Sequence, residues 1–352
     1  MARRRLPITP PLLEWLRADP AWAALPWTER GTLRWLSALG GWNAQASLEA
    51  SPPPAALDAP LLVLGPWRSG TTVLHELLVA ATGWPTPRTW QCLDPAAFRL
   101  RRAPPAAGAL PPLARPMDGL PINALSPQED EFALLGLGVP SAYRAFLMPH
   151  RLDALYESLD PAFWLNDNAW WSPWIGFLNG VLAGRNPRRL VLKSPNHLFR
   201  LNALLRRWPD LSAAWVVREP ADVLASNRKM WRAMFDAYAL TPADHNALDR
   251  FLLHALDRTG DMLLWAVQTM PQSRLVVVEH MALHHSPGAV ARASLHRLGL
   301  PALDSAAITR AVDRMAQGRV DGYAHAPADD RAVTVLNKLA AAQRAALSTH
   351  GL

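Results

Sequence analysis

The sequence is poor in the residues that build several common kinds of site. It has one cysteine in 352 residues, Cys92, which excludes an intrachain disulfide and a cysteine-rich zinc site and predicts a reducing compartment. Lysine is almost as scarce, with only Lys193, Lys229 and Lys338 among 36 basic residues. The adjacent pair His284–His285 lacks the helical spacing of metal ligands, so we expect it in a loop and predict no metal site.

Long hydrophobic runs are also missing. No apolar stretch approaches the roughly 20 residues that a membrane span needs. The basic start Met1–Arg5 is followed by prolines and charges that leave no hydrophobic region for a signal peptide. A soluble, cytoplasmic protein is therefore predicted. Half of the residues are hydrophobic, which is enough for a sizeable core in one large domain or two smaller ones.

The formal net charge is +7. Such a balance is compatible with nucleic acid, with an anionic small ligand, or with ordinary surface charge, which is the commonest case. The arginines are dispersed and the densest tract is only Arg3–Arg5, so nucleic-acid binding ranks low.

The stretch Leu61–Thr72 carries the most information. Four apolar residues, a short glycine-bounded loop and a helical pattern over 72–81 predict a strand, a tight turn and a helix in succession. The backbone N–H groups of such a turn and the positive end of the helix bind anions. The loop overlaps the phosphate-loop pattern G-x-x-x-x-G-K-[ST], but Thr71 replaces its lysine and Arg68 places a cation inside the loop. We therefore expect a phosphate or sulfate ester here, bound differently from the triphosphate of a nucleotide triphosphatase.

Four apolar runs without alternation are each followed by a helical pattern, which is typical of a parallel sheet with helices on both faces. The runs are Leu61–Leu64, Leu190–Lys193, Ala213–Val217 and Arg274–Val278. The sequence thus predicts an α/β protein, a phosphate-loop-like three-layer sandwich with helical additions at both ends. We expect a helical extension over 1–55 that ends in a proline-rich linker, the α/β domain over 56–300, and C-terminal helices packed on it over 301–352. Between the first two runs we expect a surface excursion over 101–127, a short helix over 128–137 and a longer helical region over 150–184.

Ligands of such sheets bind at the carboxyl ends of the strands. The residues that this rule brings to one edge are Arg68, Lys193, Arg218 and Glu279. Ser226 follows Arg218 by eight residues, about two turns along the next helix. A guanidinium and a hydroxyl placed in this way can hold a second phosphate, whereas Arg218 alone would be expected to cap the sheet. The anion-binding loop upstream favours the ligand role.

These motifs resemble those of the sulfotransferases that use 3′-phosphoadenosine 5′-phosphosulfate (PAPS), in the branch whose first motif reads R-S-G-T-T. The resemblance covers roughly residues 58–300. In that family the first loop holds the 5′-phosphosulfate, and the matching residues are Arg68, Ser69, Gly70, Thr71 and Thr72. A strand-end arginine and a serine eight residues later hold the 3′-phosphate, which here correspond to Arg218 and Ser226. The segment 192–197 is similar to the family's L-K-S-P-x-H, and Val276–Glu279 resembles its late strand-and-acid element.

The resemblance implies in-line transfer of a sulfuryl group from PAPS to a hydroxyl or amine of a small-molecule, carbohydrate or lipid acceptor. By analogy with phosphoryl transfer, cations stabilise the charge on the leaving oxygen, and Arg68 and Lys193 are the candidates for this catalytic role. A sulfuryl group carries less charge than a phosphoryl group, so a metal is not required.

A hydroxyl acceptor also needs a general base. Some members of the family place a glutamate soon after the first helix, but the comparable stretch here has Gln91, whose amide is a poor proton acceptor. Two catalytic candidates remain. His197 shares the predicted edge with Lys193, and its structural alternative is a histidine that bonds a backbone carbonyl near a helix start. Glu129 lies in the run Q-E-D-E, and its alternative is first-turn helix electrostatics. Arg319 is a loose match to a late basic residue that binds the 3′-phosphate.

The aromatic residues within 163–177 and 231–238 are expected to supply the core and, in part, an apolar acceptor pocket. Two other functions remain as alternatives. A kinase or nucleotide hydrolase would need a lysine at position 71 and a magnesium-binding acid, and a nucleic-acid-binding protein would need clustered basic side chains. The sequence does not predict the acceptor's identity or the oligomeric state.

Overall fold

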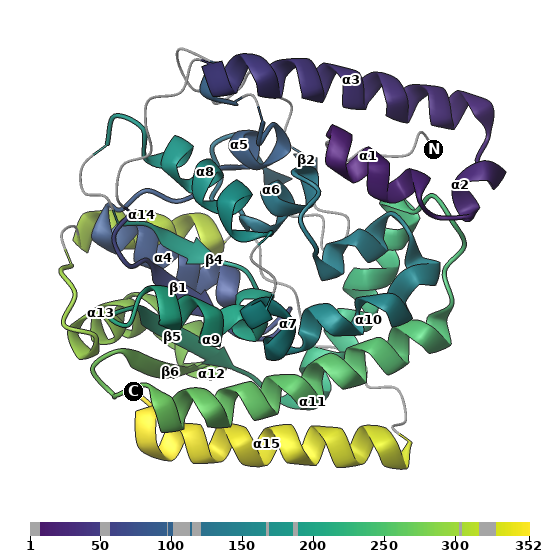
Figure 1. Ribbon diagram of the computed structural model, residues 1–352. Helices are drawn as coiled ribbons and strands as arrows, with labels where there is room; N and C mark the ends of the chain where they lie inside the picture. The colour runs from purple at the N-terminus through teal and green to yellow at the C-terminus, as the bar shows by residue number, and fades with distance from the viewer. Residues whose placement is uncertain are drawn as a thin grey trace.

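The computed structural model describes residues 8–49, 57–96, 98–100, 113–114, 121–166, 169–185, 189–302, 305–316 and 329–352 (Figure 1). A four-stranded parallel sheet is flanked by helices, which confirms the predicted α/β class. The linker expected before residue 56 and the candidate ligand Arg319 lie outside the described residues. The division of the chain into three segments stays a prediction.

The sheet has the strand order β4-β1-β5-β6. Its strands are β4 (Val191–Lys193), β1 (Leu61–Leu64), β5 (Ser212–Val217) and β6 (Leu275–Glu279). Neighbouring strands are parallel, with Val63 opposite Lys193 and Val217 opposite Glu279. The last residues of the strands therefore emerge at one edge, as predicted, and each predicted run agrees with an observed strand to within one residue.

Each face of the sheet packs on its own helices, because successive strand residues point to opposite sides. Leu61 and Val63 belong to one core, together with α4 (Thr71–Thr82), α13 (Pro287–Arg297) and α14 (Ser305–Ala316). Leu62 and Leu64 belong to a second core, together with α9 (His197–Arg207), α10 (Pro220–Tyr238) and α11 (His245–Thr269). This arrangement is the three-layer sandwich, and it explains why the strands read as continuous apolar runs.

The N-terminal helices are part of the second core. They are α1 (Pro10–Arg17), α2 (Ala21–Ala24) and α3 (Trp27–Glu49). Leu12 and Leu16 of α1 are fully buried there, while α3 lies along the upper margin of the molecule in Figure 1.

The chain between β1 and β4 is divided into short pieces. In order they are α5 (Thr89–Leu93), the 3-10 turn η1 (Phe98–Leu100), the antiparallel strands β2 (Leu113–Ala114) and β3 (Pro121–Ile122), α6 (Glu131–Gly136), the 3-10 helices η2 (Ala142–Phe146) and η3 (Pro149–Leu159), α7 (Pro161–Asn166) and α8 (Trp171–Leu182). The strand pair inside the expected excursion was not predicted. The expected helical region over 150–184 is split, because a proline, with no backbone N–H to donate, begins both η3 and α7.

The C-terminal part closes the sheet. α15 (Asp330–His350) runs beside α11 along the lower edge of Figure 1, and Gly351 then pairs with Val277 on the edge strand β6. The expected loop at His284–His285 is wrong: both residues belong to α12 (His280–His285), which follows β6 directly. None of the helices in the described ranges combines the length and apolar character needed to cross a membrane.

Candidate functional site

The turn between β1 and α4 needs glycine at both of its ends. Gly65 and Gly70 have φ values of 140° and 103°, in the region that side chains rarely adopt. A Cβ on Gly65 would lie 2.6 Å from the carbonyl oxygen of Val216, so a larger residue would separate β1 from β5. Ser69 is fully buried, and its Oγ donates to the Pro66 carbonyl at 2.8 Å. The turn is thus held in one shape, with the start of α4 at its mouth.

Arg68 connects this turn to the second predicted anion-binding element. It is the only non-glycine residue with positive φ (71°) in the described part of the chain, a conformation that requires support from its surroundings. Its Nε donates to the Oγ of Ser226 at 3.0 Å, and Nη1 of Arg218 donates to its carbonyl oxygen at 3.2 Å. The turn and the strand-end arginine, 150 residues apart in sequence, are therefore in direct contact.

Arg218 is itself fixed from two further sides. Its Nη2 lies 3.3 Å from Oδ2 of Asp222, one turn into α10, and its carbonyl accepts from Nε2 of Gln343 on α15 at 3.0 Å. Arg68, Thr72 and Arg218 are half-buried, so their side chains remain accessible from the edge of the sheet. Ser69 and Thr71 are buried and shape the turn from within.

Lys193 and Glu129 form the next part of the edge. Nζ of Lys193, at the end of β4, lies 2.5 Å from Oε1 of Glu129, which precedes α6. The hydroxyl of Tyr143 donates to the other oxygen of Glu129 and accepts from Nε1 of Trp67 at 3.0 Å. Burial, together with the charge of Glu129, raises the pKa of Tyr143 well above its usual value, so the phenol stays protonated and is a donor.

The pair Lys193–Glu129 is the outermost of three successive ion pairs. Each acid of the run 129–131 pairs with one base of the segment 193–200: Glu129 with Lys193, Asp130 with His197, and Glu131 with Arg200. The three bases have the spacing i, i+4, i+7, which places them on one face as β4 leads into α9. We call these contacts the ion-pair ladder.

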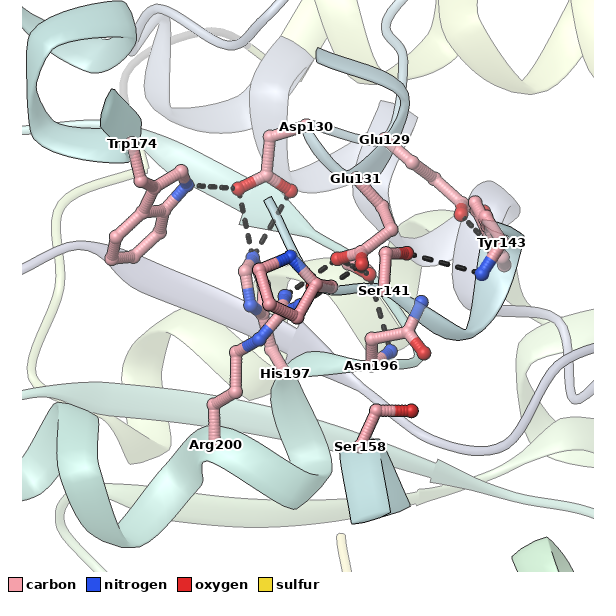
Figure 2. A network of polar contacts seen from close by, with 12 residues as sticks. Glu129, Asp130, Glu131, Ser141, Tyr143, Ser158, Trp174, Asn196, His197 and Arg200 are labelled. Atoms are coloured by element: carbon pink, nitrogen blue, oxygen red, sulfur yellow. Dashed lines mark hydrogen bonds and ion pairs between the residues drawn. The ribbon is translucent and has the colours of Figure 1, made fainter. Parts of the chain in front are cut away.

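His197 is enclosed inside this ladder. Its Nε2 lies 2.8 Å from Oδ2 of Asp130, which also accepts from Nε1 of Trp174 at 2.6 Å (Figure 2). His197 and Asp130 have no exposed side-chain surface, and Nδ1 of His197 has no partner among the described residues. Burial raises the pKa of Asp130, but the charge and hydrogen bond of His197, the indole N–H and the charge of Arg200 outweigh it and leave the pKa below its ordinary value.

Glu131 and Arg200 form the innermost pair. Nη1 and Nη2 of Arg200 lie 2.5 and 2.9 Å from the two oxygens of Glu131, and neither side chain is exposed. The guanidinium also stacks 4.1 Å from the ring centroid of Trp164. The last acid and base of the ladder are thus completely desolvated but fully matched in charge (Figure 2).

Several other residues near the site have structural partners. Oε1 of Gln91 accepts from the backbone N–H of Arg88 and caps α5. His75 bonds Thr86, and burial, with the nearby charge of Lys193, lowers its pKa to about 3, so it is neutral. The described aromatic side chains of the two expected clusters lie mainly in the core: Trp164, Trp170, Trp174, Phe177, Trp231 and Phe235 are buried.

Comparison with known proteins agrees with this geometry. A sequence model of the sulfotransferase family matches residues 60–305, which span the sheet, the turn, the ladder and the strand-end arginine. The chain belongs to the sulfotransferase family.

Two curated sulfotransferases are each 32% identical over 199 residues, covering 54% of this chain and 50% of the relative. Both are named omega-hydroxy-beta-dihydromenaquinone-9 sulfotransferase Stf3, from Mycobacterium bovis and Mycobacterium tuberculosis. The chain thus spans about half the length of these curated relatives.

Two solved sulfotransferases share the fold. The structure of STF9 from Mycobacterium avium has a TM-score of 0.64 at 19% identity, covering 97% of this chain and 91% of that one. The structure of STF1 from Mycobacterium tuberculosis also has a TM-score of 0.64, at 20% identity, covering 94% and 90%.

The candidate site contains residues that were not predicted from sequence. Tyr143, Asp130, Glu131 and Arg200 join the predicted Glu129, Lys193 and His197 in one network, and His280 lies against Gly70. The matching charges of 129–131 and 193–200 were a visible signal, but nothing local to either segment indicated that they meet. Within the described ranges, no three His, Cys, Asp or Glu side chains gather in a way that could hold a metal.

Proposed function

We propose that this chain is a PAPS-dependent sulfotransferase that transfers a sulfuryl group to a hydroxyl of a small-molecule acceptor. The observation that carries the proposal is the contact between Arg68, Ser226 and Arg218. It joins a turn suited to one anion with an arginine–serine pair suited to another, and PAPS carries two separate anionic groups.

The residues present suit such a donor. The turn offers helix-start N–H groups and the cation Arg68 to the phosphosulfate, while Arg218 and Ser226 offer a guanidinium and a hydroxyl to the 3′-phosphate. Gly70 has no side chain, and the imidazole of His280 lies in the place that a Cβ would take. When bound, PAPS supplies an activated sulfuryl group whose bridging oxygen gains negative charge as the bond to sulfur breaks. Arg68 and Lys193 are the cations that would stabilise that charge.

Of the two predicted bases, we favour Glu129. Its side chain is 14% exposed and contacts Lys193, whereas His197 is fully buried and committed to Asp130. A general base must reach the proton that it removes, which favours a group at the open end of the ladder. Glu129 would accept the proton of the acceptor hydroxyl, and Tyr143, which donates to it, would orient its carboxylate.

The acceptor class is proposed from the relatives. The curated relatives are named for an omega-hydroxylated menaquinone, so a terminal hydroxyl on an apolar chain is the first acceptor to test. The proposal that the enzyme is cytoplasmic rests on its single cysteine, Cys92.

Calorimetry distinguishes the donor from other nucleotides. Wild type should bind 3′,5′-ADP more tightly than AMP, and more tightly than ATP with magnesium. Arg218→Ala should lose about 10- to 100-fold in affinity for 3′,5′-ADP and little for AMP, because it removes a charge-assisted hydrogen bond to the 3′-phosphate. The matched control is Arg228→Ala on α10, the helix that follows Arg218, because the Arg228 guanidinium pairs with Asp249 instead.

Activity is then measured by transfer of labelled sulfate from PAPS to an omega-hydroxylated prenylquinone. Equal binding of AMP and 3′,5′-ADP by the wild type would contradict the proposed donor. Tighter binding of ATP with magnesium, followed by phosphate transfer, would instead support the kinase alternative.

A further inference from the structure

His280 lies beside the proposed donor site, although none of the motifs includes it. It follows β6 directly, at the edge of the sheet where Arg68 and Arg218 also lie. A Cβ on Gly70 would come within 2.8 Å of Cδ2 of His280, so the half-buried imidazole lies directly against the mouth of the turn. An anion bound at Gly70 therefore has this ring as a neighbour.

The ring is held neutral by its surroundings. Burial lowers the pKa of His280 to about 4, the charges of Arg218 and His284 act in the same direction, and Asp222 opposes them. These groups come from the end of β5, from α12 and from α10, while the turn itself contributes Gly70 and, two residues earlier, Arg68. Part of the low pKa is thus imposed by a cation that the proposed function assigns to the 3′-phosphate.

We propose that His280 is a further donor-site residue, whose imidazole takes up a proton when a 3′-phosphate binds at Arg218 and then adds a third positive group to that phosphate. The inference rests on the proposed function, since it assumes that Arg218 and Ser226 hold the 3′-phosphate. It differs from that function in predicting proton uptake at one named side chain.

The size of the effect follows from linkage. If the phosphate restored the ordinary value of 6.5, His280 would take up about 0.9 proton on binding at pH 5.5. Because the bound form has the higher pKa, the extra affinity is present in acid and is lost as the pH rises through 6.5. A return of the pKa to 6.5 would make binding about tenfold tighter at pH 5.5 than at pH 8 through this residue. The 3′-phosphate itself takes up a proton near pH ~6, so the contribution of His280 is the difference in proton uptake between wild type and a variant that lacks this histidine.

The experiment is calorimetric titration with 3′,5′-ADP at pH 5.5, in two buffers that differ in ionisation enthalpy. The dependence of the heat on the buffer gives the number of protons taken up. His280→Gln keeps a polar side chain but cannot be protonated, and it should take up fewer protons than wild type, by up to about 0.9. The control His285→Gln removes an exposed histidine at the far end of the same helix and should behave as wild type. With AMP, whose only phosphate binds at the turn, the difference between wild type and His280→Gln should be smaller than with 3′,5′-ADP, and an equal difference would overturn the role of the 3′-phosphate.

The outcomes separate this inference from the proposed function. Equal proton uptake by wild type and His280→Gln would overturn the role of His280 and leave the donor assignment intact. Failure of wild type to prefer 3′,5′-ADP over AMP would overturn the donor assignment and the inference with it. The wild type alone also tests the inference. Proton uptake with 3′,5′-ADP no greater than the phosphate alone would give would overturn it. The test therefore stays decisive even if His280→Gln fails to fold.

Discussion

The innermost pair of the ladder predicts a large loss of stability when its charge is removed. Glu131→Gln keeps the shape of the side chain but leaves the guanidinium of Arg200 buried without a counter-ion. The amide also turns an N–H₂ toward a group that can only donate hydrogen bonds. Breaking a fully buried ion pair in this way typically costs about 3–5 kcal/mol.

The structure supports the upper part of that range. Both side chains are fully buried, and the two N–O distances are 2.5 and 2.9 Å, so two charge-assisted hydrogen bonds are affected. Each such bond is worth about 1.5–3 kcal/mol. The stacking of Arg200 on Trp164 persists in the variant, but it does not neutralise the charge.

The chain contains a matched control. Arg228 and Asp249 form the same two-point contact at 2.9 and 3.1 Å, but their side chains are 19% and 33% exposed. Asp249→Asn should therefore lower the free energy of unfolding by no more than about 1 kcal/mol. The two amide substitutions differ mainly in burial, so their difference isolates the effect of desolvation.

Chemical denaturation of the two variants and of Glu131→Leu/Arg200→Met measures these effects. The double variant removes both charges and should recover most of the loss, because an apolar pair of similar volume needs no counter-ion. A loss in Glu131→Gln no greater than in Asp249→Asn would refute the reasoning. So would a double variant as unstable as the single one, since this result would point to packing rather than to an uncompensated charge.

Three further predictions concern the ladder and the turn. Asp130→Asn should destabilise the protein near neutral pH, and the loss should shrink as the pH falls below about 4. The folded-state pKa of Asp130 lies under its unfolded value of 3.8, so the stabilisation that its carboxylate provides is lost in acid. Unfolding midpoints measured between pH 3 and 7 test this, and a loss that does not change with pH would contradict it. Gly70→Ala should weaken 3′,5′-ADP binding at least about tenfold, because φ is 103° and the new Cβ would meet His280; normal binding in calorimetry would contradict this. Gly31→Ala is the control on α3, where the new Cβ would lie in open space. Thermal melting should show that it stabilises the helix by about 0.5–1 kcal/mol. Glu129→Gln should lower kcat about 10²- to 10⁴-fold with unchanged affinity for 3′,5′-ADP, in steady-state assays with PAPS; retention of full activity would exclude Glu129 as the base.

The strands and the turn were readable from the sequence because their signals are local. A buried parallel strand needs a continuous apolar run, and a turn that admits an anion needs glycine where φ is positive, so β1 and Gly70 are marked by their own residue types. The position of Arg218 at the edge of the sheet was also predictable, because it directly follows an apolar run that forms a parallel strand. The expected loop at His284–His285 failed because a helix of six residues, His280–His285, contains too little periodicity to be recognised.

The ladder was not readable because its information is split between two distant segments. In sequence, Glu129 and its two acidic neighbours look like the start of a helix, where acids are common. The helix α6 does begin at Glu131, but all three carboxylates point to bases more than 60 residues later. His280 was missed for a similar reason, since its significance depends on Gly70 lying 210 residues earlier.

The gradient of burial along the ladder separates its structural part from its chemical part. A buried charge that loses its counter-ion is destabilising by several kcal/mol, so Asp130–His197 and Glu131–Arg200, with no exposed side-chain surface, must keep their partners throughout a catalytic cycle. Glu129 is 14% exposed, and its carboxylate can change partners because water or an acceptor hydroxyl can replace a lost contact. The two inner pairs fix the segment that carries Glu129 against the strand end that carries Lys193. Proton transfer and charge stabilisation are therefore expected at the outer pair, and substitutions at the inner pairs should reduce stability before they affect the chemistry.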